Sequence, residues 1–146
     1  MNNQEVEILL VEDNADDAAL TIRTLKKHNL ANNLIHLKDG AEALEFIFGT
    51  GKYTGKNTDS LPRFVLLDLK MPKVSGIEVL QKVKSSAKTK SIPVVILTSS
   101  AEDPDIKQCY ELGANSYIVK PVEFDNFAKT VAELGLYWMI FNRYSK

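Results

Sequence analysis

Short apolar runs alternate five times along this chain with segments whose apolar residues recur at helical spacing. The apolar runs occupy residues 6–11, 34–37, 63–67, 92–97 and 116–119, and the helical patterns occupy residues 16–28, 40–48, 76–87, 103–112 and 123–134. Consecutive strand–helix–strand units form parallel strand pairs through right-handed crossovers. The alternation therefore predicts the α/β class, with a doubly wound, parallel five-stranded sheet whose carboxyl ends share one edge.

The third apolar run leads directly into a carboxylate, Asp68. Residues 64–67 are all apolar, and turn residues follow Asp68 until Gly76 opens the next helical pattern. A continuous apolar run of this length is typical of a strand buried on both faces. The residue just past such a strand faces the crevice where ligands bind in open parallel sheets. Taken alone, Asp68 is also explained as a cap of the following turn.

The composition excludes several classes of protein. A chain of 146 residues is the size of one domain, and its formal net charge of −1 provides no basic face for nucleic acid. The lone cysteine, Cys109, excludes an intramolecular disulfide and is typical of a reducing compartment. Neither a secretory signal nor an apolar window of ~18 residues is visible. We therefore expect a cytoplasmic protein with no nucleic-acid and no membrane partner.

Polar residues with complementary chemistry follow the other strands. Glu12 and Asp13 follow the first strand, Thr98 the fourth and Lys120 the fifth. Neighbouring carboxylates repel each other, so three of them at one edge favour a bound cation, and an oxygen-rich site with few ligands suits Mg²⁺. A metal, a carboxylate nucleophile and donors for an anion are what phosphoryl transfer onto Asp68 requires. The alternative is a structural Asp–Lys ion pair beside unrelated turn caps.

From residue 7 to residue 134 the chain resembles the receiver domain of two-component response regulators, the fold of the chemotaxis protein CheY. The matching motifs are Val11-Glu12-Asp13-Asn14, Leu67-Asp68, Met71-Pro72 with Gly76, Leu97-Thr98 and Tyr117-Ile118-Val119-Lys120-Pro121. The resemblance implies a (βα)5 flavodoxin-like fold with strand order 2-1-3-4-5. It also implies a signalling protein that catalyses at most its own phosphorylation and dephosphorylation.

The resemblance assigns Asp68 as the phosphoacceptor and places Mg²⁺ beside it. Asp13 and Asp68 would bind the metal directly, together with the backbone carbonyl of Lys70, and Glu12 would act through water. Neither His28 nor His36 is expected at the strand-end edge, so the phosphoryl group would come from a partner histidine kinase.

The resemblance also implies a switch. Lys120 would pair with the phosphoryl oxygens, Thr98 would donate a hydrogen bond to one of them, and Tyr117 would be the aromatic residue that moves inward after phosphorylation. The Lys120–Pro121 peptide bond is expected to be cis.

Three alternatives remain beside the phosphoacceptor. An aspartyl-phosphate phosphohydrolase would carry an acid two residues after its nucleophile, where this chain has Lys70. A flavodoxin-like FMN-binding protein shares the predicted topology. A receiver that acts as a scaffold independently of phosphorylation would not require the complete set of acids and lysine.

Two additions to the receiver pattern remain, and we expect one receiver domain over residues 5–146 that includes both. The first is a long loop at residues 49–61 with three glycines, which lacks the spacing of a phosphate-binding loop. The second is an apolar helical extension at residues 135–146. Both resemble single-domain regulators paired with bacterial phytochrome histidine kinases.

As a helix, the extension would be apolar nearly all round, so we expect a homodimer or partner contact there. Its residues are Leu136, Tyr137, Trp138, Met139, Ile140 and Phe141. No output domain is expected after Leu134, so the output would be a change in partner binding or dimerisation.

Overall fold

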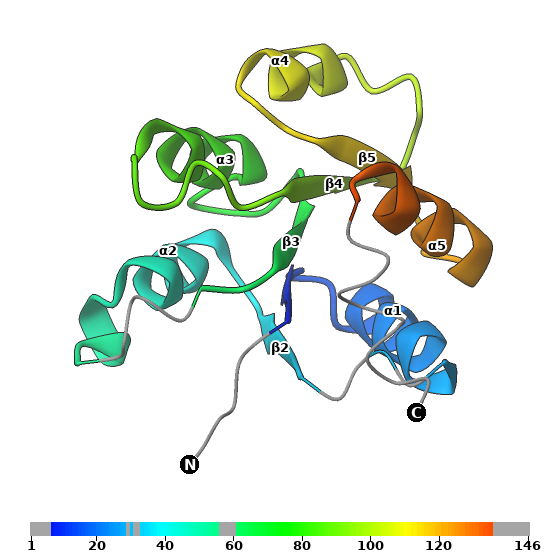
Figure 1. The fold of residues 1–146 in the computed structure, drawn as a ribbon, viewed down its shortest axis with the longest axis horizontal. Coiled ribbons are helices and arrows are strands. Elements are labelled where there is room, and N and C mark those ends of the chain that lie inside the picture. Colours follow the sequence, from blue (N-terminus) through cyan, green and yellow to red (C-terminus); the bar gives the residue numbers. More distant parts are fainter. Residues whose placement is uncertain (1–6, 29, 31–32, 56–60, 136–146) are drawn as a thin grey trace.

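Five parallel strands form one sheet in the order β2-β1-β3-β4-β5 (Figure 1), which confirms the predicted fold and strand order. The computed structural model describes residues 7–28, 30, 33–55 and 61–135. The strands are β1 (Ile8–Val11), β2 (Leu34–Leu37), β3 (Phe64–Asp68), β4 (Val94–Thr98) and β5 (Ser116–Val119). Val11 pairs with Leu67, and Thr98 pairs with Val119. This register brings the residues that follow β1, β3 and β5 to the same edge.

Helices cover both faces of the sheet and alternate with the strands. They are α1 (Ala15–Lys27), α2 (Gly40–Phe48), α3 (Gly76–Ser85), α4 (Asp105–Glu111) and α5 (Phe124–Glu133), with a 3₁₀ turn, η1 (Gly51–Tyr53). Figure 1 shows α1 and α5 on one side of the sheet and α2 and α3 on the other. None of the helices in the described part of the chain is long and apolar enough to cross a membrane.

The buried apolar residues form two clusters, one on each face of the sheet, because successive strand residues point in opposite directions. Leu9, Val65 and Ile96 pack with residues of α2, α3 and α4, whereas Leu10, Leu66 and Val95 pack with residues of α1 and α5. The central strands β1, β3 and β4 are buried throughout. This burial explains why they read as continuous apolar runs rather than alternating ones.

Side-chain caps start three of the helices. Asn14, Asp39 and Ser75 each accept a hydrogen bond from the backbone N–H three residues further on, at the starts of α1, α2 and α3. The helix predicted from residue 103 begins at Asp105, because Asp103 lies before it and accepts the Asp105 N–H at 2.9 Å. The helix predicted at residues 76–87 ends at Ser85, because Ser86 adopts an extended backbone.

The loop at residues 49–61 contains η1, which sequence analysis did not anticipate. The Tyr53 hydroxyl donates to Glu42 at 3.0 Å, and Lys52 Nζ lies 2.7 Å from the same carboxylate. The Tyr53 ring also packs edge-on against Phe46 of α2. Residues 49–55 are therefore tied to α2, while residues 56–60 lie outside the described part of the chain.

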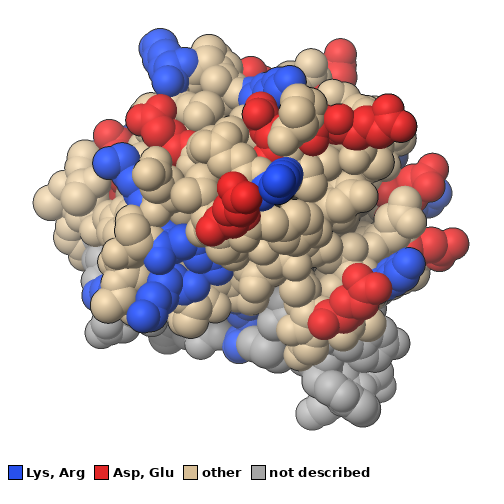
Figure 2. Space-filling model, turned by 90° about the horizontal axis from the view of Figure 1, so that it is seen from above, with Lys and Arg blue, Asp and Glu red and all other residues tan. Residues whose placement is uncertain are grey.

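Charged side chains of both signs are interspersed over the face of the molecule shown in Figure 2. This distribution agrees with the formal net charge of −1.

Candidate functional site

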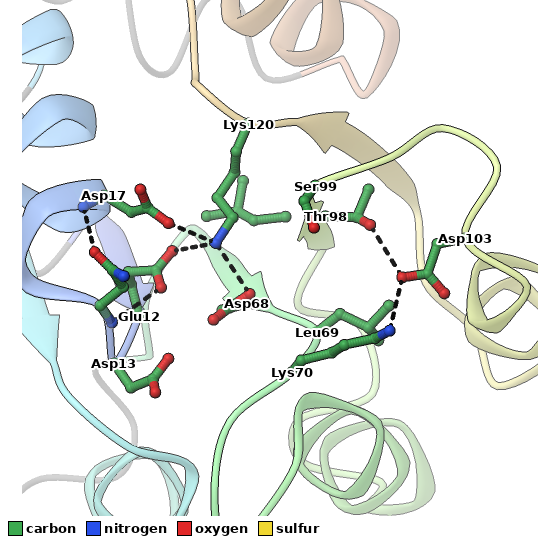
Figure 3. A pocket seen from close by; sticks show the side chains of 12 residues that line it. Glu12, Asp13, Asp17, Asp68, Leu69, Lys70, Thr98, Ser99, Asp103 and Lys120 are labelled. Carbon is green, nitrogen blue, oxygen red and sulfur yellow. Dashed lines mark hydrogen bonds and ion pairs between the residues drawn. The ribbon is translucent and has the colours of Figure 1, made fainter.

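A polar pocket of about 250 Å³ opens at the carboxyl ends of β1, β3, β4 and β5. It brings together the strand-end residues singled out from the sequence (Figure 3). Those that line it are Glu12, Asp13, Asp68, Lys70, Thr98 and Lys120. This meeting of residues more than one hundred positions apart follows from the parallel sheet.

Glu12 and Asp13, which follow β1, differ in burial. Glu12 is fully buried, and its carboxylate accepts the backbone N–H of Asn14 at 3.2 Å. Its backbone N–H donates to Leu37, and the His36 ring nitrogen Nε2 lies 2.8 Å from its carbonyl oxygen. Asp13 is exposed. His36 therefore supports the backbone behind the pocket, and it is not among the residues that line the pocket.

Asp68 ends β3 and is 5% exposed. Burial first, and then the neighbouring Glu12 carboxylate, raise the pKa of Asp68, although Lys120 opposes the shift. After Asp68, the Leu69 N–H donates to the Leu97 carbonyl of β4, and the Gly76 N–H donates to the Leu69 carbonyl and closes the connection to α3. A Cβ atom on Gly76 would overlap with the backbone of Asp68 and Leu69, so only glycine allows α3 to start this close to the site.

Lys120 reaches into the acidic cluster from the end of β5. Its Nζ lies 2.9 Å from Asp17, 3.2 Å from Glu12 and 3.4 Å from Asp68 (Figure 3). Burial lowers the pKa of Lys120, but the hydrogen bond to Asp17 and the charges of Asp68 and Glu12 outweigh it and hold this pKa above its ordinary value. The Lys120–Pro121 bond is cis, as predicted. The lysine is thus a counter-ion for the whole cluster.

Asp17 belongs to this cluster, although the sequence does not single it out. Asp17 lies in the first turn of α1, where the helix dipole favours an acidic residue. Asp13 precedes Asn14, the N-cap of α1, so helical spacing does not relate Asp13 to Asp17.

On the opposite side of the pocket, Thr98 and Lys70 meet a second acid that the sequence did not single out, Asp103. The Thr98 hydroxyl donates to Asp103 at 3.3 Å or to the Ser100 carbonyl at 3.2 Å. Lys70 Nζ lies 3.5 Å from Asp103. Despite burial, the N–H of Asp105 and then the Lys70 ammonium hold the pKa of Asp103 below its ordinary value. No local pattern in the sequence marks Asp103 as a pocket residue.

Tyr117, the predicted aromatic switch, lies on β5 but does not line this pocket. It lines a separate hollow of about 410 Å³ between α4, β5 and α5, where its ring centroid is 6.3 Å from that of Tyr110. The predicted contact residues from Leu136 to Phe141 lie outside the described part of the chain.

The donor set of the pocket fits a hard divalent cation. Carboxylate oxygens of Glu12, Asp13 and Asp68 lie within 4.8 Å of one another. Such acids repel each other unless a cation compensates their charge, and oxygen ligands are what Mg²⁺ prefers. Lys70, whose carbonyl was predicted as a further ligand, also lines the pocket.

Residues 8–132 match the family model described as the response regulator receiver domain. The chain is 42% identical to the probable methanogenesis regulatory protein FilR2 of Methanothrix harundinacea over 93% of this chain and 85% of the relative. It is 37% identical to response regulator Rcp1 of Synechocystis over 90% of this chain and 88% of Rcp1.

Solved structures with the same fold include two bacteriophytochrome response regulators. AtBRR has a TM-score of 0.82 and 51% identity, covering 90% of this chain and 94% of AtBRR. RtBRR has a TM-score of 0.81 and 44% identity, covering 94% of this chain and 89% of RtBRR. The Mn²⁺-bound form of Rcp1 has a TM-score of 0.71 and 37% identity, covering 90% and 92%.

Proposed function

The chain belongs to the response regulator receiver domain family, and we propose that Asp68 accepts a phosphoryl group from the phosphohistidine of a sensor histidine kinase. Phosphorylation then switches the binding of a partner or dimerisation. Members of this family act in signalling, and the chain is homologous to single-domain regulators of the family. The proposed output is therefore an interaction rather than turnover of a substrate.

One observation carries this proposal: the buried carboxylate of Asp68 shares its pocket with Lys120, Thr98 and a cluster of acids (Figure 3). An oxygen of Asp68 attacks the phosphorus atom, the N–P bond of the phosphohistidine breaks, and the imidazole leaves with the bonding electron pair. The product is an acyl phosphate on Asp68. The Lys120 ammonium and the Thr98 hydroxyl are donors for the oxygens on which negative charge accumulates.

We propose Mg²⁺ as the metal of this site. Asp13, Asp68 and the carbonyl of Lys70 would hold it directly, with Glu12 acting through water. The metal would neutralise charge on the phosphoryl oxygens. The close approach of the Glu12, Asp13 and Asp68 carboxylates supports a divalent cation, as does the Mn²⁺-bound form of the relative Rcp1.

The partner proposals extend beyond the pocket. Likeness to AtBRR and RtBRR supports a kinase of the phytochrome type as the phosphoryl donor. We also propose one receiver domain over residues 5–146, in a cytoplasmic protein, with a homodimer or partner contact formed by residues 136–141. The apolar sequence of that segment supports the contact.

The phosphoacceptor is tested by incubating the full chain with Mg²⁺ and a small phosphodonor and measuring the added mass of one phosphoryl group. Wild type is expected to be labelled and Asp68→Asn is not. Asp16→Asn is the matched control, because Asp16 is an exposed acid near the same edge that does not line the pocket. Equal labelling of wild type and Asp68→Asn would refute the assignment.

A further inference from the structure

Asp103 joins the pocket to the start of α4 through one nearly buried carboxylate. Its side chain is 7% exposed. Oδ2 accepts the hydrogen bond of the Thr98 hydroxyl at 3.3 Å and lies 3.5 Å from Lys70 Nζ (Figure 3). Oδ1 accepts the Asp105 N–H at 2.9 Å. One side chain therefore contacts the end of β4, the loop after β3 and the first residue of α4.

The present acceptors of the Thr98 hydroxyl compete with a phosphoryl oxygen on Asp68, to which Thr98 is proposed to donate. A threonine hydroxyl carries a single proton, so it donates one hydrogen bond at a time. Here the acceptors within reach are Asp103 Oδ2 and the Ser100 carbonyl oxygen. To donate to a phosphoryl oxygen on Asp68, Thr98 has to leave both of these acceptors, of which Asp103 is the stronger because it is charged.

We propose that Asp103 is a positioning residue that competes with the phosphoryl group on Asp68 for Thr98 and Lys70, so that phosphorylation releases Asp103 and loosens the start of α4. The proposal rests on the proposed function, because the phosphoryl group is the competitor. Lys70 is able to change partner, since its side chain is 71% exposed.

The backbone of Asp103 transmits the release to α4. Its N–H donates to Ser100 at 3.2 Å, and its carbonyl accepts the Ile106 N–H at 3.1 Å. The side chain and the main chain of Asp103 thus belong to the same turn. When the carboxylate loses Thr98 and Lys70, the turn that precedes α4 loses its attachment to the pocket.

Asp103→Asn tests the competition without removing the acceptor of the Asp105 N–H. The asparagine oxygen still accepts the Asp105 N–H, but it is a neutral and therefore weaker acceptor for Thr98 and Lys70. Beryllofluoride, which mimics a phosphoryl group on an aspartate, is expected to bind the variant roughly three- to tenfold more tightly than wild type. A defect in folding would weaken binding instead. Glu102→Gln is the control, because it removes an exposed negative charge from the adjacent residue.

The experiment titrates the full chain with beryllofluoride in the presence of Mg²⁺, followed by fluorine NMR, and measures amide hydrogen exchange over residues 105–111. In wild type, binding is expected to accelerate exchange at the first turn of α4. In Asp103→Asn, exchange there is already faster before binding. Unchanged affinity in Asp103→Asn, an equal gain in Glu102→Gln, or no change in α4 exchange would overturn the proposal.

A double-mutant cycle separates the hydroxyl contact from a general effect of charge. Asp103→Asn is combined with Thr98→Val, which lacks the hydroxyl but keeps the shape of the side chain. The gain in affinity is expected to shrink in this background. An undiminished gain would overturn the competition for Thr98. If wild type itself fails to bind beryllofluoride, the proposed function fails; if wild type binds and Asp103→Asn binds equally well, only the role of Asp103 fails.

Discussion

Lys120 Nζ lies 2.9 Å from Asp17 Oδ2, closer than the 3.4 Å that separates it from Asp68 Oδ1. The lysine from the end of β5 is therefore held by the first turn of α1 as well as by the pocket. Asp17 is the more accessible partner, with 37% of its side chain exposed against 7% for Asp68. The two contacts should consequently contribute differently to stability.

Asp17→Asn is expected to lower the free energy of unfolding by less than about 1 kcal/mol, because a partly exposed ion pair is screened by solvent. Urea denaturation at neutral pH measures the change. Asp16→Asn, on the exposed side of the same turn, controls for the effect of charge at the helix N-terminus. A loss of several kcal/mol would show that Asp17 organises the pocket rather than supplementing it.

Lys120→Met is expected to lower the free energy of unfolding further, by about 2 kcal/mol or more. Glu12 and Asp68 are then buried together without their cation. Mg²⁺ should recover part of this loss, since it compensates the same charges. Urea denaturation with and without Mg²⁺ measures both values. A loss that Mg²⁺ leaves unchanged would contradict the view of Lys120 as the counter-ion of a metal site.

Mg²⁺ is expected to raise the melting temperature of wild type, because a ligand that binds only the folded state stabilises it by about 2.7 kcal/mol at one hundred times its dissociation constant. Asp13→Asn should remove most of this increase, whereas Asp16→Asn should keep it. Thermal melts across a Mg²⁺ series provide the comparison. An undiminished increase in Asp13→Asn would exclude Asp13 from the ligand set.

Gly76→Ala is expected to destabilise the protein by more than about 2 kcal/mol, because the added Cβ overlaps with the backbone of Asp68 and Leu69 and neither can move freely. Gly55→Ala is the comparison. Gly55 has a φ of +92° but open space around it, so Gly55→Ala should lower the free energy of unfolding only by the backbone strain, about 1–2 kcal/mol. Similar losses in the two variants, measured by urea denaturation, would refute the steric explanation.

Cys109 is expected to make the folded state sensitive to alkaline pH. Burial raises the pKa of its thiol to about 11 from an ordinary value of 9.0. The unfolded chain therefore releases this proton at lower pH than the folded one, and the contribution of the thiol to stability is complete below about pH 9 and is lost as the pH rises towards 11. The difference in unfolding free energy between wild type and Cys109→Ala should shrink over that range. A difference in unfolding free energy that stays constant from pH 9 to pH 11 would contradict the raised pKa of the Cys109 thiol.

The alternating pattern of the sequence predicted the parallel sheet and the pocket at its edge, and the resemblance to receiver domains implied the strand order. Glu12, Asp68, Thr98 and Lys120 were identified because each ends an apolar run, and parallel strands bring such ends together. The 3₁₀ turn η1 was not predicted, because the contacts of Tyr53 and Lys52 with Glu42 connect two segments whose spacing shows no regular pattern.

The sequence by itself determined which strand-end residues meet in the pocket, since strand length and alternation are local properties. The tertiary structure decided how those residues are paired. Lys120 contacts Asp17 because its side chain extends across the pocket from the end of β5 to the first turn of α1, and Thr98 contacts Asp103 because the chain turns back before α4. The Thr98–Asp103 contact forms within the connection between β4 and α4. The Lys120–Asp17 contact depends instead on where the first turn of α1 lies relative to β5, a strand from another part of the chain. Helix packing sets that position, and no periodicity in the sequence encodes it.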